Sequence, residues 1–171
     1  DVGNLSQERR SGAGHTSVTS GFHAGGSGLP IFVYNTTIDK FPFASDDDAT
    51  SVGNLTQARQ NCSGNSSASF GYSSGGEYSP PYSTLNTIDK FPFAISSATA
   101  TDVGDLLTNS AYHGEGQNST VSGYQVGGAG PAIPPGNRHV IQKFPFATDA
   151  NTQDVGDLTT EMLASAAGQQ V

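Results

Sequence analysis

A seven-residue stretch occurs three times along the chain and constrains the fold more than any other feature. It reads Ile-Asp-Lys-Phe-Pro-Phe-Ala at residues 38–44 and again at 88–94, and Ile-Gln-Lys-Phe-Pro-Phe-Ala at 141–147. The copies lie 50 and 53 residues apart. A period of this size indicates that one supersecondary unit is reused along the chain.

Three further landmarks recur in a fixed order around this stretch. A Val-Gly-Asn/Asp-Leu motif begins at Val2, Val52, Val103 and Val155. Glycine is followed by an aromatic residue at Gly21-Phe22, Gly71-Tyr72 and Gly123-Tyr124. A glycine doublet then stands at Gly25-Gly26, Gly75-Gly76 and Gly127-Gly128. We therefore predict one repeat domain over 1–171, with repeats at about 6–55, 56–106 and 107–158.

The same landmarks predict that the chain is all-β. Each period holds about four short segments with strand character, separated by turns. The glycine doublets permit positive φ and predict turns, while the repeated proline cannot donate to a ladder and predicts a strand end. Four strands in about 50 residues are typical of a propeller blade. The expected structural core comprises Phe41, Phe43, Phe91, Phe93, Phe144 and Phe146 together with the six doublet glycines.

The net charge of −8 and the distribution of apolar residues argue against two classes of partner, nucleic acids and membranes. No basic patch is available to release counterions from phosphate, so nucleic-acid binding is not expected. No apolar run of about 18 residues is present, so membrane insertion is not expected. A single cysteine, Cys62, rules out an internal disulfide framework and a Cys-based zinc site.

The order of these landmarks resembles the kelch-type repeat of β-propellers. Gly25-Gly26, Phe41-Pro42-Phe43, Leu55 and Arg59 follow the kelch order of glycine doublet, aromatic third strand, fourth strand and arginine. Kelch blades usually carry a Trp after the third strand's Tyr, whereas this chain has none, and Phe41 and Phe43 occupy the aromatic positions. The resemblance implies a propeller segment made of four-stranded blades.

The amino-acid sequence of the repeat also resembles that of repeat proteins predicted in marine phages, especially cyanophages. The resemblance rests on Asp-Lys-Phe-Pro-Phe-Ala followed by a Thr-Asp-Val-Gly-Asp-Leu-Thr pattern, which reads Thr-Asp-Val-Gly-Asp-Leu-Leu at residues 101–107 and Gln-Asp-Val-Gly-Asp-Leu-Thr at 153–159. It extends over nearly the whole chain. This resemblance implies a non-enzymatic virion or tail-associated protein, located on a virion or outside the cell. Other virion proteins or copies of the same chain are then the expected partners.

The number of repeats predicts an incomplete ring. A propeller closes with about 4 to 8 blades, and three complete repeats are too few. Residues 1–5 read as the end of a preceding blade, and residues 159–171 as the start of a following one. We therefore expect that further blades, further copies or a partner cover the edges.

The repeats differ most in the loops that follow the glycine doublets, at residues 27–36, 77–86 and 129–140. Rigid scaffolds carry function on such loops. Aromatic and polar side chains suited to stacking on a host-surface carbohydrate or contacting a protein are Tyr34, Tyr78, Tyr82, Arg138 and His139. The alternative is that these residues are tolerated surface variation.

Catalytic, metal and cofactor sites are not expected. The four histidines do not recur in register, so no convergent ligand set is predicted. A cellular or secreted kelch-like interaction module is one alternative function. A second is a copper oxidase or glycan-processing propeller, because some kelch propellers are copper oxidases. Their chemistry requires a Tyr-Cys cross-link, for which Cys62 and Tyr112 lie about 50 residues apart, and two histidines at the same centre, for which no convergent pair is predicted.

Overall fold

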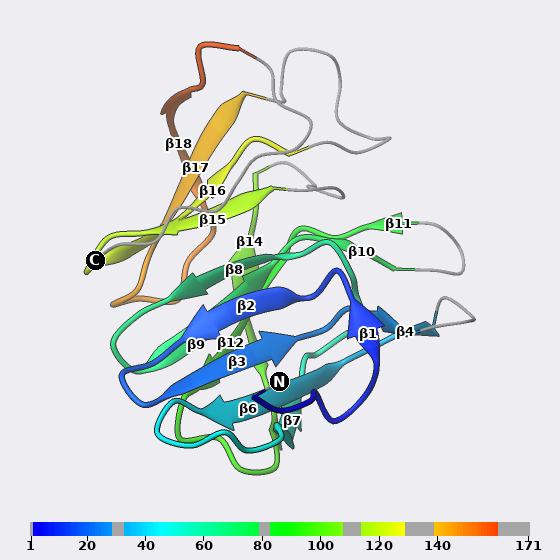
Figure 1. The fold of residues 1–171 in the computed structure, drawn as a ribbon. Coiled ribbons are helices and arrows are strands. Elements are labelled where there is room, and N and C mark those ends of the chain that lie inside the picture. The colour runs from blue at the N-terminus through cyan, green and yellow to red at the C-terminus, as the bar shows by residue number, and fades with distance from the viewer. Residues whose placement is uncertain (1, 29–32, 79–82, 108–113, 129–138, 161–171) are drawn as a thin grey trace.

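The computed structural model describes residues 2–28, 33–78, 83–107, 114–128 and 139–160, and throughout these ranges the chain is all-β (Figure 1). Three antiparallel sheets follow one another along the chain. The first blade contains β2 (Ala13–Thr16), β3 (Ser20–Ala24), β6 (Thr37–Pro42) and β7 (Thr50–Asn54). The second blade contains β8 (Ser63–Ser66), β9 (Phe70–Ser74), β12 (Thr87–Pro92) and β14 (Thr101–Asp105). The third blade contains β15 (Glu115–Asn118), β16 (Ser122–Val126), β17 (Val140–Pro145) and β18 (Gln153–Asp157).

The blades are arranged as in a β-propeller segment. Within each blade, every strand pairs with the strand before it, so the first strand lies at one edge and the fourth at the other. The first strands of successive blades are neighbours, since β8 contacts both β2 and β15. A short strand, β13 (Ala98–Thr99), pairs in parallel with β7 and joins the second repeat to the first blade. The three described blades do not close a ring (Figure 1).

Short additional strands form in the connecting segments where the sequence predicts only loops. β4 (Ser27–Gly28) and β5 (Val33–Tyr34) follow the first doublet, and β10 (Glu77–Tyr78) and β11 (Ser83–Thr84) follow the second. β1 (Arg9–Arg10) pairs with β4. These segments therefore begin as hairpins, which gives the side chains on them defined directions.

The glycine doublets and the prolines lie at strand ends. All six doublet glycines have positive φ, between 61° and 105°, a region that side chains rarely adopt. Pro42, Pro92 and Pro145 are the last residues of β6, β12 and β17. The second strand of each blade thus ends at the glycine doublet, and the third strand ends at the proline.

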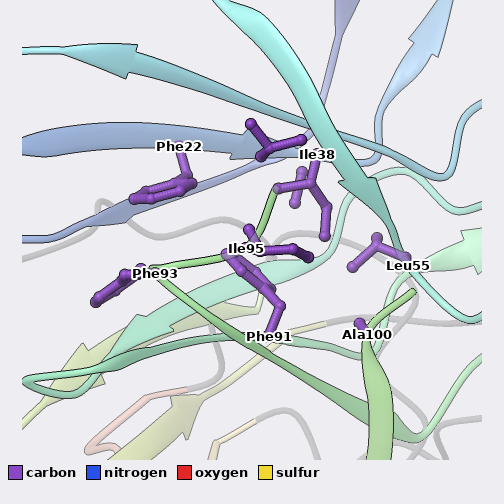
Figure 2. Packing of buried hydrophobic residues seen from close by; sticks show 9 residues of the cluster. Phe22, Ile38, Leu55, Phe91, Phe93, Ile95 and Ala100 are labelled. Carbon is purple, nitrogen blue, oxygen red and sulfur yellow. The ribbon is translucent and has the colours of Figure 1, made fainter. Parts of the chain in front are cut away.

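The apolar core lies mainly between blades. Phe22 and Ile38 of the first blade pack with Phe91, Phe93 and Ile95 of the second repeat (Figure 2). An equivalent cluster joins the next pair of blades and contains Tyr72, Ile88, Leu106 and Phe144. Burying one such side chain contributes about 1.5–3 kcal/mol, so each blade is stabilised chiefly by its neighbour.

Phe43 departs from the expected core. Phe91 and Phe144 are fully buried and Phe93 is buried, but 53% of Phe43 is exposed. Phe93 stacks on Phe22 of the preceding blade, whereas the described chain has no blade before the first on which Phe43 can pack. Phe41 and Phe146 are half-buried.

Buried ion pairs explain the one change in the seven-residue stretch. Arg9 pairs with Asp39 at 2.9 Å and Arg59 with Asp89 at 3.0 Å, and all four side chains are fully buried. The third repeat has no arginine before Arg138, and Gln142 replaces the aspartate. A neutral amide avoids leaving an unpaired carboxylate in the core, which is costly.

Gln142 keeps the acceptor role of the two aspartates. Asp89 accepts hydrogen bonds from the backbone nitrogen and the hydroxyl of Thr56, at 2.8 and 2.7 Å. Gln142 Oε1 accepts from the backbone nitrogen of Leu107 at 2.6 Å and from the Thr152 hydroxyl at 2.9 Å. The link between the preceding outer strand and the next blade is therefore preserved without the ion pair.

Candidate binding surfaces

One edge of the molecule, here called the rim, consists of five short strands. β4, β5, β10 and β11 follow the first two glycine doublets, and β1 pairs with β4. Figure 1 shows β1, β4, β10 and β11 along the same side of the molecule. Tyr34 lies at the end of β5 and Tyr78 at the end of β10, and both are half-buried. Two of the five residues predicted to bind a ligand are thus held on adjacent repeats.

A polar cluster connects these two repeats. Gln60 Nε2 donates to the Tyr34 hydroxyl at 3.3 Å and to Glu77 Oε1 at 2.6 Å. Asn61 Nδ2 also donates to Glu77 Oε1, at 3.0 Å. Glu77 is buried, and its Oε2 has no hydrogen-bond partner within the described part of the chain. The cluster places the Tyr34 hydroxyl beside the half-buried amide of Gln60, while the Glu77 carboxylate is buried.

Of the other predicted ligand-binding residues, the structure describes only His139. Tyr82 and Arg138 lie outside the described residues, as does Tyr112. His139 Nε2 lies 3.2 Å from Asp157 Oδ1, an ion pair whenever the imidazole is protonated. The described contacts therefore link Tyr34 to Glu77 through Gln60, and place His139 against β18 of the third blade.

Sequence reasoning missed Gln60, Asn61 and Glu77. The available signal was a departure from the repeat: Glu77 follows its glycine doublet where Ser27 follows the first. Both Asn61 and its counterpart Ser11 have positive φ, at 56° and 60°. A charged residue at a position that is otherwise small, beside a strained backbone, marks a place where the repeats have diverged.

A second candidate surface is a groove along the innermost strands. It has a volume of about 300 Å³ and is lined by small and polar groups that include Gly14, Asn61, Cys62, Gly64, Glu115 and Gly116. Burial raises the pKa of the Cys62 thiol, with smaller opposing contributions from Arg59 and backbone hydrogen bonds. A raised pKa keeps the thiol protonated, so Cys62 is a poor nucleophile.

His15 links the first two blades. Its Nδ1 lies 3.1 Å from the Asn65 carbonyl oxygen, and its Nε2 lies 3.0 Å from the Ser73 hydroxyl. Burial lowers the pKa of His15 from 6.5 to about 4, so its imidazole is neutral at neutral pH. Burial also lowers the pKa of His23, as does the nearby Arg9 charge.

Metal-binding and membrane-spanning features were sought in the described ranges. No group of three or more His, Cys, Asp or Glu side chains converges there in a way that holds a metal ion. Nor does any helix in those ranges have the length and apolar character needed to cross a membrane.

Comparisons with known proteins yielded a structural similarity only. No family model matches the sequence, and no curated protein matches it. A solved structure described as that of YjhT is similar, with a TM-score of 0.74 at 13% sequence identity. The alignment covers 93% of this chain and 55% of the YjhT chain. At this identity the similarity shows the fold alone, and the chain spans little more than half of that structure.

Proposed function

We propose that this chain is a non-enzymatic kelch-type repeat protein of a phage virion or tail, which binds a host-surface glycan or another virion subunit through its rim. The observation that carries this proposal is the cluster of Tyr34, Gln60 and Glu77 across adjacent repeats. The resemblance of the repeat to marine phage proteins supplies the virion or extracellular location. Binding of this kind requires no cofactor.

The chemistry of the rim suits a carbohydrate. Tyrosine presents an apolar ring face with a polar tip, which stacks on a sugar ring while donating or accepting a hydrogen bond. The half-buried amide of Gln60, which donates to the buried Glu77 carboxylate, also has an oxygen that accepts hydrogen bonds from sugar hydroxyls. Each contact is weak, and the copy number of a virion component raises the overall avidity.

The test is binding of the purified protein to a panel of bacterial surface polysaccharides and to purified virion subunits. Replacing Tyr34 and Tyr78 together with Ala should weaken binding at least about tenfold, which corresponds to 1.4 kcal/mol. Because both side chains lie on short surface hairpins, the unfolding midpoint should stay unchanged.

A matched control is Val18→Ala, which alters an exposed side chain at the turn between β2 and β3. This variant should bind like the unaltered protein. If the double tyrosine variant binds as well as the unaltered protein, the rim is not the binding surface. If mass spectrometry finds no peptides of this chain in purified particles, the proposed virion location is wrong.

The second candidate function is a cellular or secreted kelch-like interaction module. The same rim favours it, because tyrosine is enriched at protein interfaces as well as at sugar sites. The two functions differ in context. A virion protein is recovered in a symmetric particle, whereas an interaction module is recovered free or with a cellular partner.

A further inference from the structure

The two junctions between successive blades are built in the same way. Phe22 stacks on Phe93 with ring centroids 5.0 Å apart, and Tyr72 stacks on Phe146 at 4.9 Å. In both pairs, the aromatic after the glycine on one blade meets the last phenylalanine of the repeated stretch on the next. Such stacks contribute about 0.5–1.5 kcal/mol beyond the burial of their area.

Close backbone contact along the inner strands also repeats. A Cβ placed on Gly64 would collide with the carbonyl oxygen of Gly14, and a Cβ on Gly116 with that of Gly64. The equivalent position on the first blade is Gly14, and nothing lies within 4 Å of a Cβ placed there. The face of the first blade that points away from the second is therefore open along its inner strand.

The remainder of this first-blade face is also unfilled. Phe43 is largely exposed, and a groove of about 390 Å³ beside it is lined by Phe41 and Phe43 and by inner-strand residues of all three blades, among them Gly14, Gly64 and Gly116. His23 holds the strand position of Ser73, which contacts the preceding blade in the second repeat. Its Nε2 is buried and has no hydrogen-bond partner among the described residues.

Among the described residues, the third blade is open on the opposite side. Carbonyl oxygens of the following repeat crowd the outer-strand glycines of the earlier repeats, with Asp47 O 2.6 Å from a Cβ on Gly3 and Ala150 O 2.5 Å from one on Gly104. A Cβ on the equivalent Gly156 meets nothing within 4 Å. Tyr124 pairs in register with Lys143 just as Tyr72 does with Lys90, so it holds the stacking position.

We propose that a second copy of this chain occupies the open face of the first blade, with the third blade of one copy packing head-to-tail on the first blade of the other. In this arrangement Tyr124 stacks on Phe43 of the second copy, and the Gly116 carbonyl lies over Gly14. The interface continues the junction already present twice within each chain. It is independent of the proposed glycan or virion binding.

Two copies have the right number of blades to close a ring. Each chain supplies three blades, so two chains supply six, within the range of about 4 to 8 in which propellers close. Head-to-tail interfaces form rings whenever the rotation closes.

Docking requires an exchange at the outer edge of the face. Residues 2–5 occupy the place of a preceding outer strand: Asn4 O accepts from the Ala49 nitrogen at 2.8 Å, as Asn54 O accepts from the Ala100 nitrogen at 2.7 Å. β18 of the incoming copy needs this same place. Residues 2–5 are therefore displaced on docking, and their removal frees the site.

Sedimentation equilibrium of the 171-residue chain, at concentrations up to about 100 μM, tests the proposal. The expected mass is about 35 kDa, twice the 17.5 kDa of one chain. Gly14→Val fills the open position without touching its own chain and should weaken association at least about tenfold. Deleting residues 1–5 should preserve or strengthen the dimer.

Val18→Ala serves here as the control and should remain dimeric. A monomer at all concentrations would overturn the proposal, and would leave further repeats of a longer natural chain as the occupant of the face. A dimer that tolerates both Gly14→Val and Phe43→Asp would also overturn it, because the contact would then lie elsewhere. Far-ultraviolet circular dichroism of each variant checks that the blades are folded.

Discussion

At the scale of single residues, identical letters in the repeat have different physical roles according to the blade that carries them. Phe93 and Phe43 hold the same position in two copies of the seven-residue stretch, yet Phe93 is buried between blades and 53% of Phe43 is exposed. His15, Asn65 and Gln117 hold the same strand position with different side chains. The sequence predicts position within a repeat, but the neighbouring blade decides burial.

This difference yields a matched pair of substitutions. Phe93→Ala should lower the free energy of unfolding by about 3–5 kcal/mol, because it leaves a cavity beside Phe22 and Phe91. Phe43→Ala should cost less than about 1 kcal/mol in the monomer, since much of its ring is already in water. Urea unfolding followed by circular dichroism measures both. Equal losses for the two variants would contradict the assigned burial.

Residue-level prediction from the sequence had definite limits. The glycine doublets and prolines were predictable because their backbone restrictions act locally, whatever surrounds them. The polar cluster around Glu77 was not predictable, because it depends on contacts between Gln60, Asn61 and Tyr34 that arise only when two repeats pack together. Tyr34 and Tyr78 were proposed from composition and loop position, and their role in binding stays a prediction.

At the scale of elements, side chains on the inner strands tie each blade to the next. His15 on β2 bonds to the Asn65 carbonyl on β8 and to Ser73 on β9. Asn65 Nδ2 in turn donates to the Gln117 carbonyl on β15, at 2.7 Å. The four-strand order within each repeat was predictable from local signals, whereas these inter-blade bonds depend on how neighbouring strands approach.

The His15 link predicts a pH dependence of stability. Its pKa is lowered from 6.5 in the unfolded chain to about 4 in the folded one, so the unfolded chain binds the proton more readily. The stabilisation is fully present above about pH 6.5 and is lost as pH falls toward 4. The loss amounts to about 3 kcal/mol at 1.36 kcal/mol per pKa unit.

His15→Asn isolates this effect, because Asn occupies the same position in the second blade. Urea unfolding at pH 7 and pH 4 should show a larger loss of stability in the unaltered protein than in the variant. His23, whose pKa is also lowered, is present in both proteins, so its contribution cancels apart from its coulombic interaction with His15. Parallel pH profiles for the two proteins would show that His15 is not the titrating group.

At the scale of the whole molecule, the described residues form three successive blades, and within those residues one face is open at each end. All-β architecture and incomplete closure were predictable from the number and period of the repeats. The shape of the open faces was not, because it depends on the close backbone approach at Gly64 and Gly116 and on its absence at Gly14 and Gly156. The structure thus defines the shape of the two open faces, which the number of repeats alone does not predict.

The most direct test of this arrangement compares the thermal unfolding of Gly64→Val and Gly14→Val in dilute solution. Both glycines hold the same position on an inner strand, and only Gly64 lies against a backbone carbonyl of the preceding blade. Gly64→Val should lose about 1–3 kcal/mol or fail to fold, while Gly14→Val should change by less than about 0.5 kcal/mol. If valine is tolerated equally at both positions, or is worse at Gly14, the inner strands do not pack as described and the blade arrangement is wrong.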